Sequence, residues 1–268
     1  MAVKKVKTLI LRTAGTNCDK ETAFAFRQKG ASCDLVHINE LVANKKKMHD
    51  YHVLAVPGGF TYGDDIESGR ILANEINAFL RAELDKFIAN GKLVIGICNG
   101  FQVLVKAGIL PGAKDSNVKP GAQSATLYNN DSGKFEDRWV YLKVEGKSPW
   151  TKGMKDIVYL PVAHAEGKFI TPEKGALKSL HDSGQIAFRY VSSSGEKAVY
   201  PENPNGSYED IAGITDKTGR VLGLMPHPER HFLFVNHPSW TRLTKREKFG
   251  DGAQIFHNGV AYIKSAKL

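Results

Sequence analysis

A cysteine and a histidine–glutamate pair are the residues whose types and spacing suit covalent chemistry. Cys98 stands in Gly-Ile-Cys-Asn-Gly, directly after the apolar run 92–97 and before a segment with helical spacing. His227 lies between two prolines, and Glu229 follows it by two positions in Met-Pro-His-Pro-Glu. A thiol nucleophile needs a base, and a carboxylate that accepts the second ring N–H of a histidine fixes its tautomer and stabilises the imidazolium. These residues predict a catalytic triad in which Cys98 is the nucleophile and His227 the base.

The glycines around the cysteine indicate a sharp turn from a strand into a helix. Gly96 and Gly100 let the strand and the helix pack closely, and such a turn projects the nucleophile out of the sheet. The N-terminus of the helix favours a thiolate and points backbone N–H groups at an oxyanion. The alternative for Cys98 is a buried structural cysteine, and we expect that role for Cys18 and Cys33, which lack this context.

A second glycine turn follows the apolar run 51–56. Gly58 and Gly59 stand in Pro-Gly-Gly-Phe, where two glycines allow a tight turn at the end of a strand. We expect the N–H groups of Gly59 and Asn99 to hold an oxyanion formed at Cys98. An ordinary Gly-Gly turn is the alternative for this segment.

The first half of the chain alternates strand-like and helix-like segments. We expect strands at 7–12, 33–38, 51–56 and 92–97, and helices at 19–30, capped by Asp19, at 71–90 and at 100–107. The second half is richer in strands, at 139–144, 157–162, 185–190, 210–215 and 221–225. This order predicts an α/β fold with a mostly parallel sheet, helices on both faces and a smaller antiparallel strand region. The carboxyl ends of the parallel strands would then carry the active crevice.

Composition limits the classes of protein that fit. The chain has 268 residues with 42% hydrophobic and 24% charged side chains, which predicts a single globular domain over 1–268 with a C-terminal extension at about 232–268. No apolar run approaches the roughly 20 residues of a membrane span, so we expect no membrane partner. The net charge is +9, but the basic residues are spread along the chain without interleaved aromatics, so we expect no nucleic-acid partner. Three cysteines in no zinc-like spacing predict reduced thiols, no metal site and a cytoplasmic protein.

Together the motifs resemble the class I, or triad-type, glutamine amidotransferases. Gly-Ile-Cys-Asn-Gly-Phe-Gln is similar to their nucleophile segment, Pro-Gly-Gly-Phe to their oxyanion strand, and Pro-His-Pro-Glu to their histidine–glutamate pair. Longer blocks resemble one branch of that family, the glutaminase subunits of phosphoribosylformylglycinamidine synthase, at 15–41, 57–65, 96–112, 160–169 and 203–230. Asparagine directly after the cysteine is typical of this branch, whose own fold is the flavodoxin-like α/β fold.

The resemblance implies a glutaminase that forms a thioester on Cys98 and supplies ammonia for purine synthesis. Six positions match substrate contacts of the family: Gly58, Phe60, Gln102, Gly133, Lys134 and Phe135. The last three lie in a segment similar to the family loop that grips the α-amino and carboxylate groups of glutamine.

The resemblance also implies partners, namely a large synthetase subunit and a small accessory subunit of the same synthase. The sequence has no Gly-x-x-x-x-Gly-Lys-[Ser/Thr] loop, so we expect no cofactor in this chain and place ATP and Mg²⁺ on the synthetase subunit. We expect the basic stretch 242–248 to help in docking that subunit. Three alternatives are a glutaminase serving another synthase, a redox sensor or chaperone with a similar cysteine turn, and a nucleic-acid-binding protein.

Overall fold

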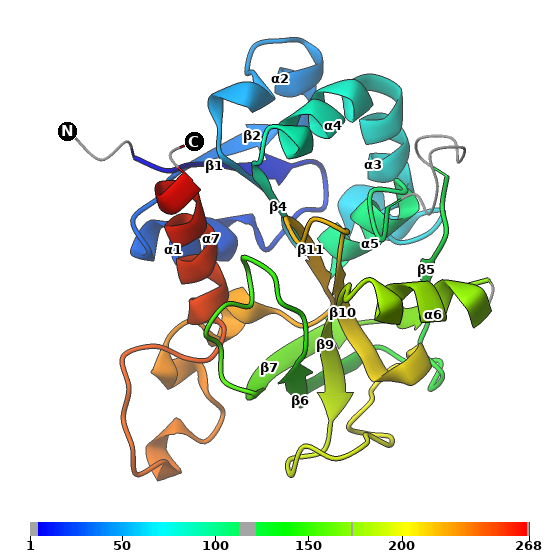
Figure 1. Ribbon diagram of the computed structural model, residues 1–268, viewed down its shortest axis with the longest axis vertical. Coiled ribbons are helices and arrows are strands. Elements are labelled where there is room, and N and C mark those ends of the chain that lie inside the picture. The colour runs from blue at the N-terminus through cyan, green and yellow to red at the C-terminus, as the bar shows by residue number, and fades with distance from the viewer. Residues whose placement is uncertain (1–4, 113–121, 173, 267) are drawn as a thin grey trace.

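A mixed sheet runs through the middle of the molecule (Figure 1). The computed structural model describes residues 5–112, 122–172, 174–266 and 268. Within these residues the sheet has nine strands in the order β2-β1-β3-β4-β11-β10-β9-β6-β7. Its strands are β1 (Lys7–Arg12), β2 (Ser32–His37), β3 (Val53–Val56), β4 (Leu93–Ile97), β6 (Glu136–Val144), β7 (Ile157–His164), β9 (Ile186–Val191), β10 (Ile211–Thr215) and β11 (Val221–Leu224). Two further strands form a separate antiparallel pair, β5 (Thr126–Asn129) and β8 (Glu166–Ile170).

Helices cover both faces of the parallel strands. They are α1 (Asp19–Gln28), α2 (Ile38–Val42), α3 (Arg70–Glu75), α4 (Arg81–Ala89), α5 (Asn99–Lys106), α6 (Lys174–Asp182) and α7 (Ala253–Ala266). Figure 1 shows α1 and α7 on one side of the strands and α3, α4 and α5 on the other. The predicted α/β fold class is confirmed. Among the described helices, none has the length and apolar character that crossing a lipid bilayer requires.

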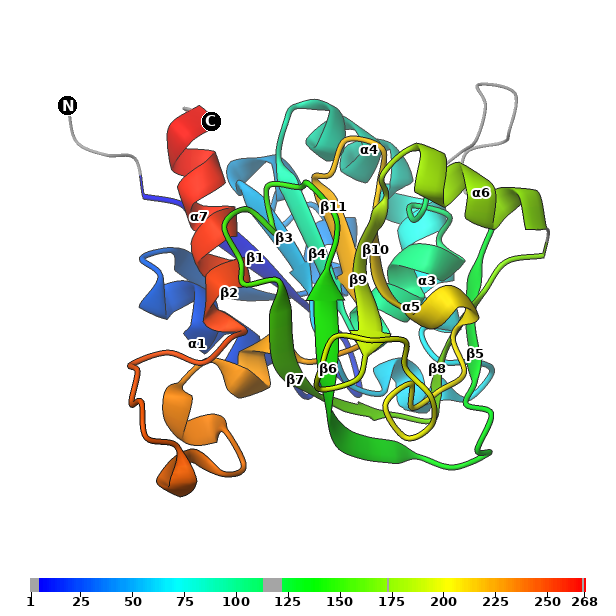
Figure 2. The same ribbon diagram turned by 60° about the horizontal axis from the view of Figure 1, so that its bottom comes forward.

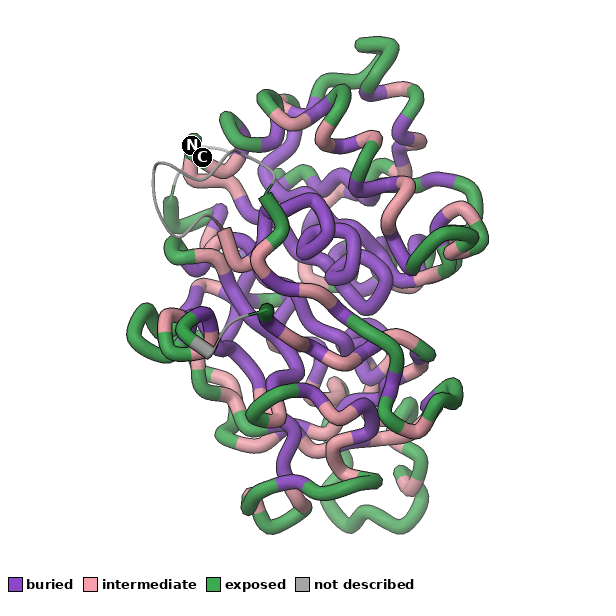
Figure 3. Tube along the Cα trace, turned by 90° about the vertical axis from the view of Figure 1, so that its right-hand side faces the viewer, coloured by how far each residue is buried: buried purple, intermediate pink, exposed green. Residues whose placement is uncertain are grey.

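The sheet changes from parallel to antiparallel at β11. Strands β2, β1, β3, β4 and β11 are parallel to one another, and from β11 through β10, β9 and β6 to β7 each pair is antiparallel. The antiparallel strands therefore extend the parallel ones within one sheet, and among the described residues β5 and β8 form the separate small region. Every residue of β3 and β4 is buried, as expected for parallel strands covered on both faces. The buried part of the chain trace lies centrally, and the exposed part lies mostly at peripheral loops (Figure 3).

The start of α1 differs from the prediction that Asp19 caps it. Cys18 is the residue that precedes the helix, and Asp19 is the first helical residue. The carboxylate of Asp19 lies 2.6 Å from Nε of Arg12, the last residue of β1. Because the ion pair engages the carboxylate, this acidic residue ties the helix to the strand instead of capping it.

The predicted helix 71–90 is one helical run with an irregular centre. Between α3 and α4 the residues Ile76–Leu80 form a π-helical segment. A π turn contains one more residue than an α turn, so it changes which residues face the sheet. Phe79, which has the spacing of the apolar face, is 64% exposed. Regular helical periodicity does not predict such a turn, and β5, β8 and α6 were also not predicted.

The C-terminal residues belong to the hydrophobic core. Helix α7 packs along α1, the first helix of the chain (Figure 2). Phe256 on α7 meets Phe26 on α1 edge to face, with ring centroids 5.0 Å apart, and both rings are fully buried. Phe232, near the start of the predicted extension, is also buried and contacts Phe256. Fully burying one such ring stabilises a fold by roughly 2–3 kcal/mol.

Candidate active site

Cys98 occupies the turn between β4 and α5. Its torsions of φ 52° and ψ −109° form a conformation that residues other than glycine rarely adopt. The Cys98 N–H donates a hydrogen bond of 2.8 Å to the carbonyl oxygen of Leu224 on β11, which holds the turn. A Cβ at Gly100 would lie 1.8 Å from the carbonyl oxygen of Val56. Glycine at that position is therefore what lets α5 begin so close to the sheet.

His227 and Glu229 form a buried pair in the segment after β11. Nδ1 of His227 lies 2.6 Å from Oε1 of Glu229, and the two side chains are 2% and 0% exposed. The backbone N–H of His227 donates to the carbonyl oxygen of Pro161 on β7 at 2.8 Å, which fixes the histidine against that strand. Burial lowers the pKa of His227, but the Glu229 carboxylate and the Cys98 thiol outweigh it and raise the pKa well above its usual value. An imidazolium at His227 is therefore stabilised.

The sheet brings Cys98, the predicted nucleophile, and His227, the predicted base, to one edge. β4 and β11 are parallel neighbours, and their last residues Ile97 and Leu224 are paired. A Cβ added at Gly58 would lie 2.8 Å from Cε1 of His227 and 3.5 Å from Cβ of Cys98, so the three residues meet at one point. Nε2 of His227 has no hydrogen-bond partner in the part of the chain that the structure describes. This nitrogen is thus available to take the proton of the thiol.

Gly59 and Asn99, the predicted oxyanion donors, lie on adjoining segments. Asn99 is the first residue of α5, where a helix leaves its N–H groups without intrahelical partners. In the turn after β3, the N–H of Phe60 donates to the carbonyl oxygen of Gly15 at 2.9 Å. The next N–H, of Thr61, donates to Oδ1 of Asn99 at 3.3 Å. These two bonds occupy the N–H groups of Phe60 and Thr61, the residues that follow Gly59, and they fix the turn to the start of α5. The N–H groups of Gly59 and Asn99 stay the predicted oxyanion donors.

Gln102 lies one helical turn beyond the nucleophile and is buried in a polar network. Its Oε1 accepts a hydrogen bond of 3.0 Å from Nδ2 of Asn99. Its Nε2 donates to the backbone carbonyl of Glu166 on β8. Gln102 therefore links the start of α5 to the small antiparallel sheet, and its predicted contact with substrate stays a prediction.

The remaining predicted substrate contacts lie on two exposed loops. Phe60 and Phe135 are both about half exposed, and their rings stack with centroids 6.4 Å apart. Phe135 directly follows Gly133 and Lys134 in the turn between β5 and β6. The loop predicted to bind glutamine therefore contacts Phe60, the residue that follows the predicted oxyanion donor Gly59.

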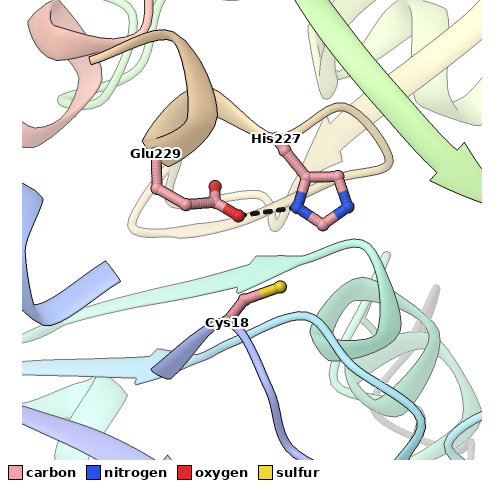
Figure 4. A group of neighbouring side chains, drawn as sticks. All are labelled: Cys18, His227 and Glu229. Atoms are coloured by element: carbon pink, nitrogen blue, oxygen red, sulfur yellow. Dashed lines mark hydrogen bonds and ion pairs between the residues drawn. The ribbon is translucent and has the colours of Figure 1, made fainter. Parts of the chain in front are cut away.

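Cys18 lies at the site although the sequence did not predict it there. Its side chain is buried, as expected, but one ligand atom each of Cys18, His227 and Glu229 lies within 4.8 Å of the others (Figure 4). The Cys18 N–H donates to the carbonyl oxygen of Gly58 at 3.2 Å. Cys18 follows β1, which is a parallel neighbour of β3, and this position was the signal that could have placed Cys18 near the site. Cys33 is buried between β2 and α1, as expected of a structural cysteine.

A second residue that sequence reasoning did not assign to the site is His164, at the end of β7. Its Nδ1 lies 3.1 Å from Oδ1 of Asn130, and its Nε2 lies 3.5 Å from Nδ2 of Asn205. Burial lowers the pKa of His164 to about 3, so the ring is neutral. The preceding residue, Ala163, accepts a contact of 3.6 Å from Sγ of Cys98 through its carbonyl oxygen. The neutral network therefore holds the end of β7 that contacts Cys98.

Comparisons with known proteins identify the family of this chain. Residues 5–263 match the family described as the CobB/CobQ-like glutamine amidotransferase domain. A protein of Dehalococcoides mccartyi named phosphoribosylformylglycinamidine synthase subunit PurQ is 46% identical, over 98% of this chain and 99% of that protein. A protein of the same name from Archaeoglobus fulgidus is 42% identical, over 97% of this chain and 98% of that protein.

A solved structure is similar to this chain along most of its length. In the structure of PurLQS from Thermotoga maritima, one chain is 29% identical to this one and superposes with a TM-score of 0.72. The match covers 97% of this chain and 100% of that chain. The chain belongs to the CobB/CobQ-like glutamine amidotransferase family and, within it, to the PurQ subunits of phosphoribosylformylglycinamidine synthase.

Proposed function

We propose that this chain is the glutaminase of a phosphoribosylformylglycinamidine synthase and delivers ammonia to a synthetase subunit in de novo purine biosynthesis. The observation that carries the proposal is the buried His227–Glu229 pair beside Cys98 at a strand-to-helix turn. The names of its relatives support the choice of synthase, and the similar chain in a PurLQS structure supports a multi-subunit assembly.

The first half of the reaction forms a thioester. His227 takes the thiol proton through Nε2, and Sγ of Cys98 attacks the side-chain amide carbon of glutamine. The negative charge that develops on the carbonyl oxygen is held by the N–H groups of Gly59 and Asn99. The imidazolium, stabilised by Glu229, then gives its proton to the leaving nitrogen, so the C–N bond breaks and ammonia departs.

The second half restores the enzyme. Water attacks the γ-glutamyl thioester while His227 accepts a proton from it, and the same two amides hold the second oxyanion. The C–S bond breaks, glutamate leaves, and the proton returns to the sulfur of Cys98. Glu229 keeps one tautomer of the histidine throughout, because its Oε1 lies 2.6 Å from Nδ1.

Ammonia is useful to a synthase only while it is unprotonated, and bulk water at neutral pH would protonate it. We place its consumption on a large synthetase subunit that binds ATP and Mg²⁺ and converts formylglycinamide ribonucleotide to formylglycinamidine ribonucleotide. A small accessory subunit completes the assembly. A glutaminase in such a complex is expected to be slow on its own and fast when the synthetase is present.

The test is Cys98→Ala in the reconstituted complex, assayed twice. Synthesis driven by glutamine should vanish, whereas synthesis driven by added ammonium salt should continue, because only the nucleophile is lost. Cys33→Ala is the matched control and should keep both activities, since that thiol is buried between β2 and α1. Glutamine-dependent synthesis that survives in Cys98→Ala would refute the proposed chemistry. Activity only with a synthase of another pathway would refute the assignment to purine synthesis.

A further inference from the structure

Three side chains of the site form a compact set of possible metal ligands. Cys18 comes from the loop between β1 and α1, and His227 and Glu229 come from the segment after β11. A sulfur, a ring nitrogen and a carboxylate oxygen of these residues lie within 4.8 Å of one another, and all three residues are buried. Figure 4 shows the sulfur of Cys18 directed toward the His227–Glu229 pair.

Two buried atoms of this set lack hydrogen-bond partners. In the described part of the chain, Nε2 of His227 and Oε2 of Glu229 accept or donate no hydrogen bond. Buried polar atoms are usually paired, so each of these needs an explanation. The reaction accounts for Nε2, which receives the proton of Cys98. It does not account for Oε2 of Glu229, or for a second thiol beside the pair.

The sulfur of Cys18 has polar partners on two sides. Nη2 of Arg230 donates to the sulfur at 3.2 Å, and Oδ1 of Asn17 accepts from it at 3.1 Å. Arg230 is itself held by Glu21 at 3.1 Å, and its positive charge favours the thiolate form of Cys18.

We propose that Cys18, His227 and Glu229 bind a soft divalent cation of the zinc type, and that the bound cation inhibits the glutaminase. Zn²⁺ takes thiolate, imidazole and carboxylate ligands at about 2.0–2.3 Å, which puts ligand atoms roughly 3.5 Å apart. Small side-chain rotations bring atoms that now lie within 4.8 Å to that spacing. One thiolate and one carboxylate balance the charge of the ion, and the thiol proton of Cys18 and the extra proton of the His227 imidazolium leave as it binds.

The inhibition follows from the ligands that the ion takes. A nitrogen of His227 bound to a cation no longer accepts a proton, and Glu229 no longer stabilises an imidazolium. Only this inhibitory part rests on the proposed glutaminase function, because the binding part concerns the three side chains alone. The spacing of the cysteines predicted no metal site, since these ligands come from both ends of the chain.

Binding is tested with Co²⁺, whose bond to a thiolate gives a near-ultraviolet charge-transfer band, on the purified chain. The Cys98→Ser variant keeps the three ligands and should show the band, whereas Cys18→Ser should lose it. Cys33→Ser is the matched control and should keep it. A band that persists in Cys18→Ser, or that disappears in Cys98→Ser, would overturn the site. Circular dichroism checks that each variant is folded. X-ray absorption of Zn²⁺-loaded Cys98→Ser should show one sulfur ligand, and a spectrum without a sulfur ligand would also overturn the site.

Inhibition is tested by titrating Zn²⁺ against glutamine-dependent synthesis by the complex. The half-inhibiting concentration should rise roughly 100-fold in Cys18→Ser, relative to the metal-free rate of the same variant. Cys33→Ser should match the wild type, and a chelator should restore activity. Equal inhibition of Cys18→Ser and wild type would overturn the inhibitory role. A chain that shows the cobalt band but no glutaminase activity would refute the proposed function and leave the metal site standing.

Discussion

The ring of Phe60 stacks on the ring of Phe135, with centroids 6.4 Å apart and planes inclined by 30°. Phe60 follows Gly59, the predicted oxyanion donor, and Phe135 follows Lys134 in the turn between β5 and β6. The first loop follows β3 of the nine-stranded sheet, and the second connects β5 of the small sheet to β6 of the large one. A single aromatic contact therefore couples the oxyanion turn to the loop predicted to hold the α-groups of glutamine.

Phe135→Ala should raise the KM for glutamine more than it lowers kcat. Aromatic pairs contribute about 0.5–1.5 kcal/mol beyond burial, which corresponds to a roughly five-fold loss of affinity. Steady-state ammonia release by the complex measures both constants. Tyr128→Ala is the control, because Tyr128 is an exposed aromatic on β5 outside the stack. A fall in kcat at constant KM would contradict a role in binding.

Glu229→Gln should lower kcat for glutamine roughly 10³–10⁴-fold while the fold persists, because an amide does not stabilise the imidazolium of His227. The hydrogen bond at Nδ1 is 2.6 Å long and buried, so no water replaces the carboxylate. Ammonia-dependent synthesis by the same complex should be unchanged. Glu196→Gln, at an exposed position, is the matched control. A loss below ten-fold would show that Glu229 is not the partner of the base.

Cys98→Gly should be more stable to unfolding than Cys98→Ala, by about 1 kcal/mol, because the torsions at this turn favour glycine. Cys33 provides the opposite control. It lies within β2, where glycine costs stability, so Cys33→Gly should be less stable than Cys33→Ala. Urea unfolding of the four variants gives both differences. The same order at both positions would argue against strain at Cys98.

The free energy of unfolding should depend on pH through His164. The folded pKa is about 3 and the unfolded value about 6.5, so the unfolded chain binds this proton first as the pH falls. Stability from the neutral ring is complete above pH 6.5 and is lost toward pH 3, with about 2 kcal/mol gone at pH 5. Between pH 7 and 5, His164→Gln should therefore lose about 2 kcal/mol less than the wild type in urea unfolding. Equal losses would show that His164 is not held neutral.

Removing residues 231–268 should unfold the chain rather than only weaken its docking. The deletion strips Phe232 and α7 from the core and exposes Phe26 on α1. Two buried phenylalanine rings at roughly 2–3 kcal/mol each are a large part of a typical stability of 5–15 kcal/mol. Near-ultraviolet circular dichroism of the truncated chain measures this, and a native spectrum would contradict it.

The predicted docking role of the stretch 242–248 is tested with surface substitutions that leave the core in place. Lys245→Glu with Arg246→Glu reverses two exposed charges and leaves the core intact. If the stretch docks the synthetase subunit, the double variant should keep its melting temperature and bind the subunit more weakly as measured by ultracentrifugation. Unchanged binding at low ionic strength would rule the stretch out.

The sequence predicted the parts of this molecule that local chemistry determines. Apolar runs placed the central strands, and the glycines at 96 and 100 placed the turn at Cys98. Contacts between residues that are far apart in the sequence and that the sheet brings together could not be predicted from local sequence patterns. Cys18 looks structural along the chain and meets His227 only because β1, β3, β4 and β11 are neighbours in space. Asp19 looks like a cap until Arg12 engages its carboxylate, and the π turn at Ile76–Leu80 has no periodic signature.

The position of β11 has a consequence for the order of synthesis. This strand lies between β4 and β10 and leads to His227, the predicted base, although it is the last strand along the described residues. A growing chain thus exposes the thiol of Cys98 long before His227 leaves the ribosome. We expect a chain that ends before His227 to hydrolyse no glutamine, because it has the thiol without the predicted base.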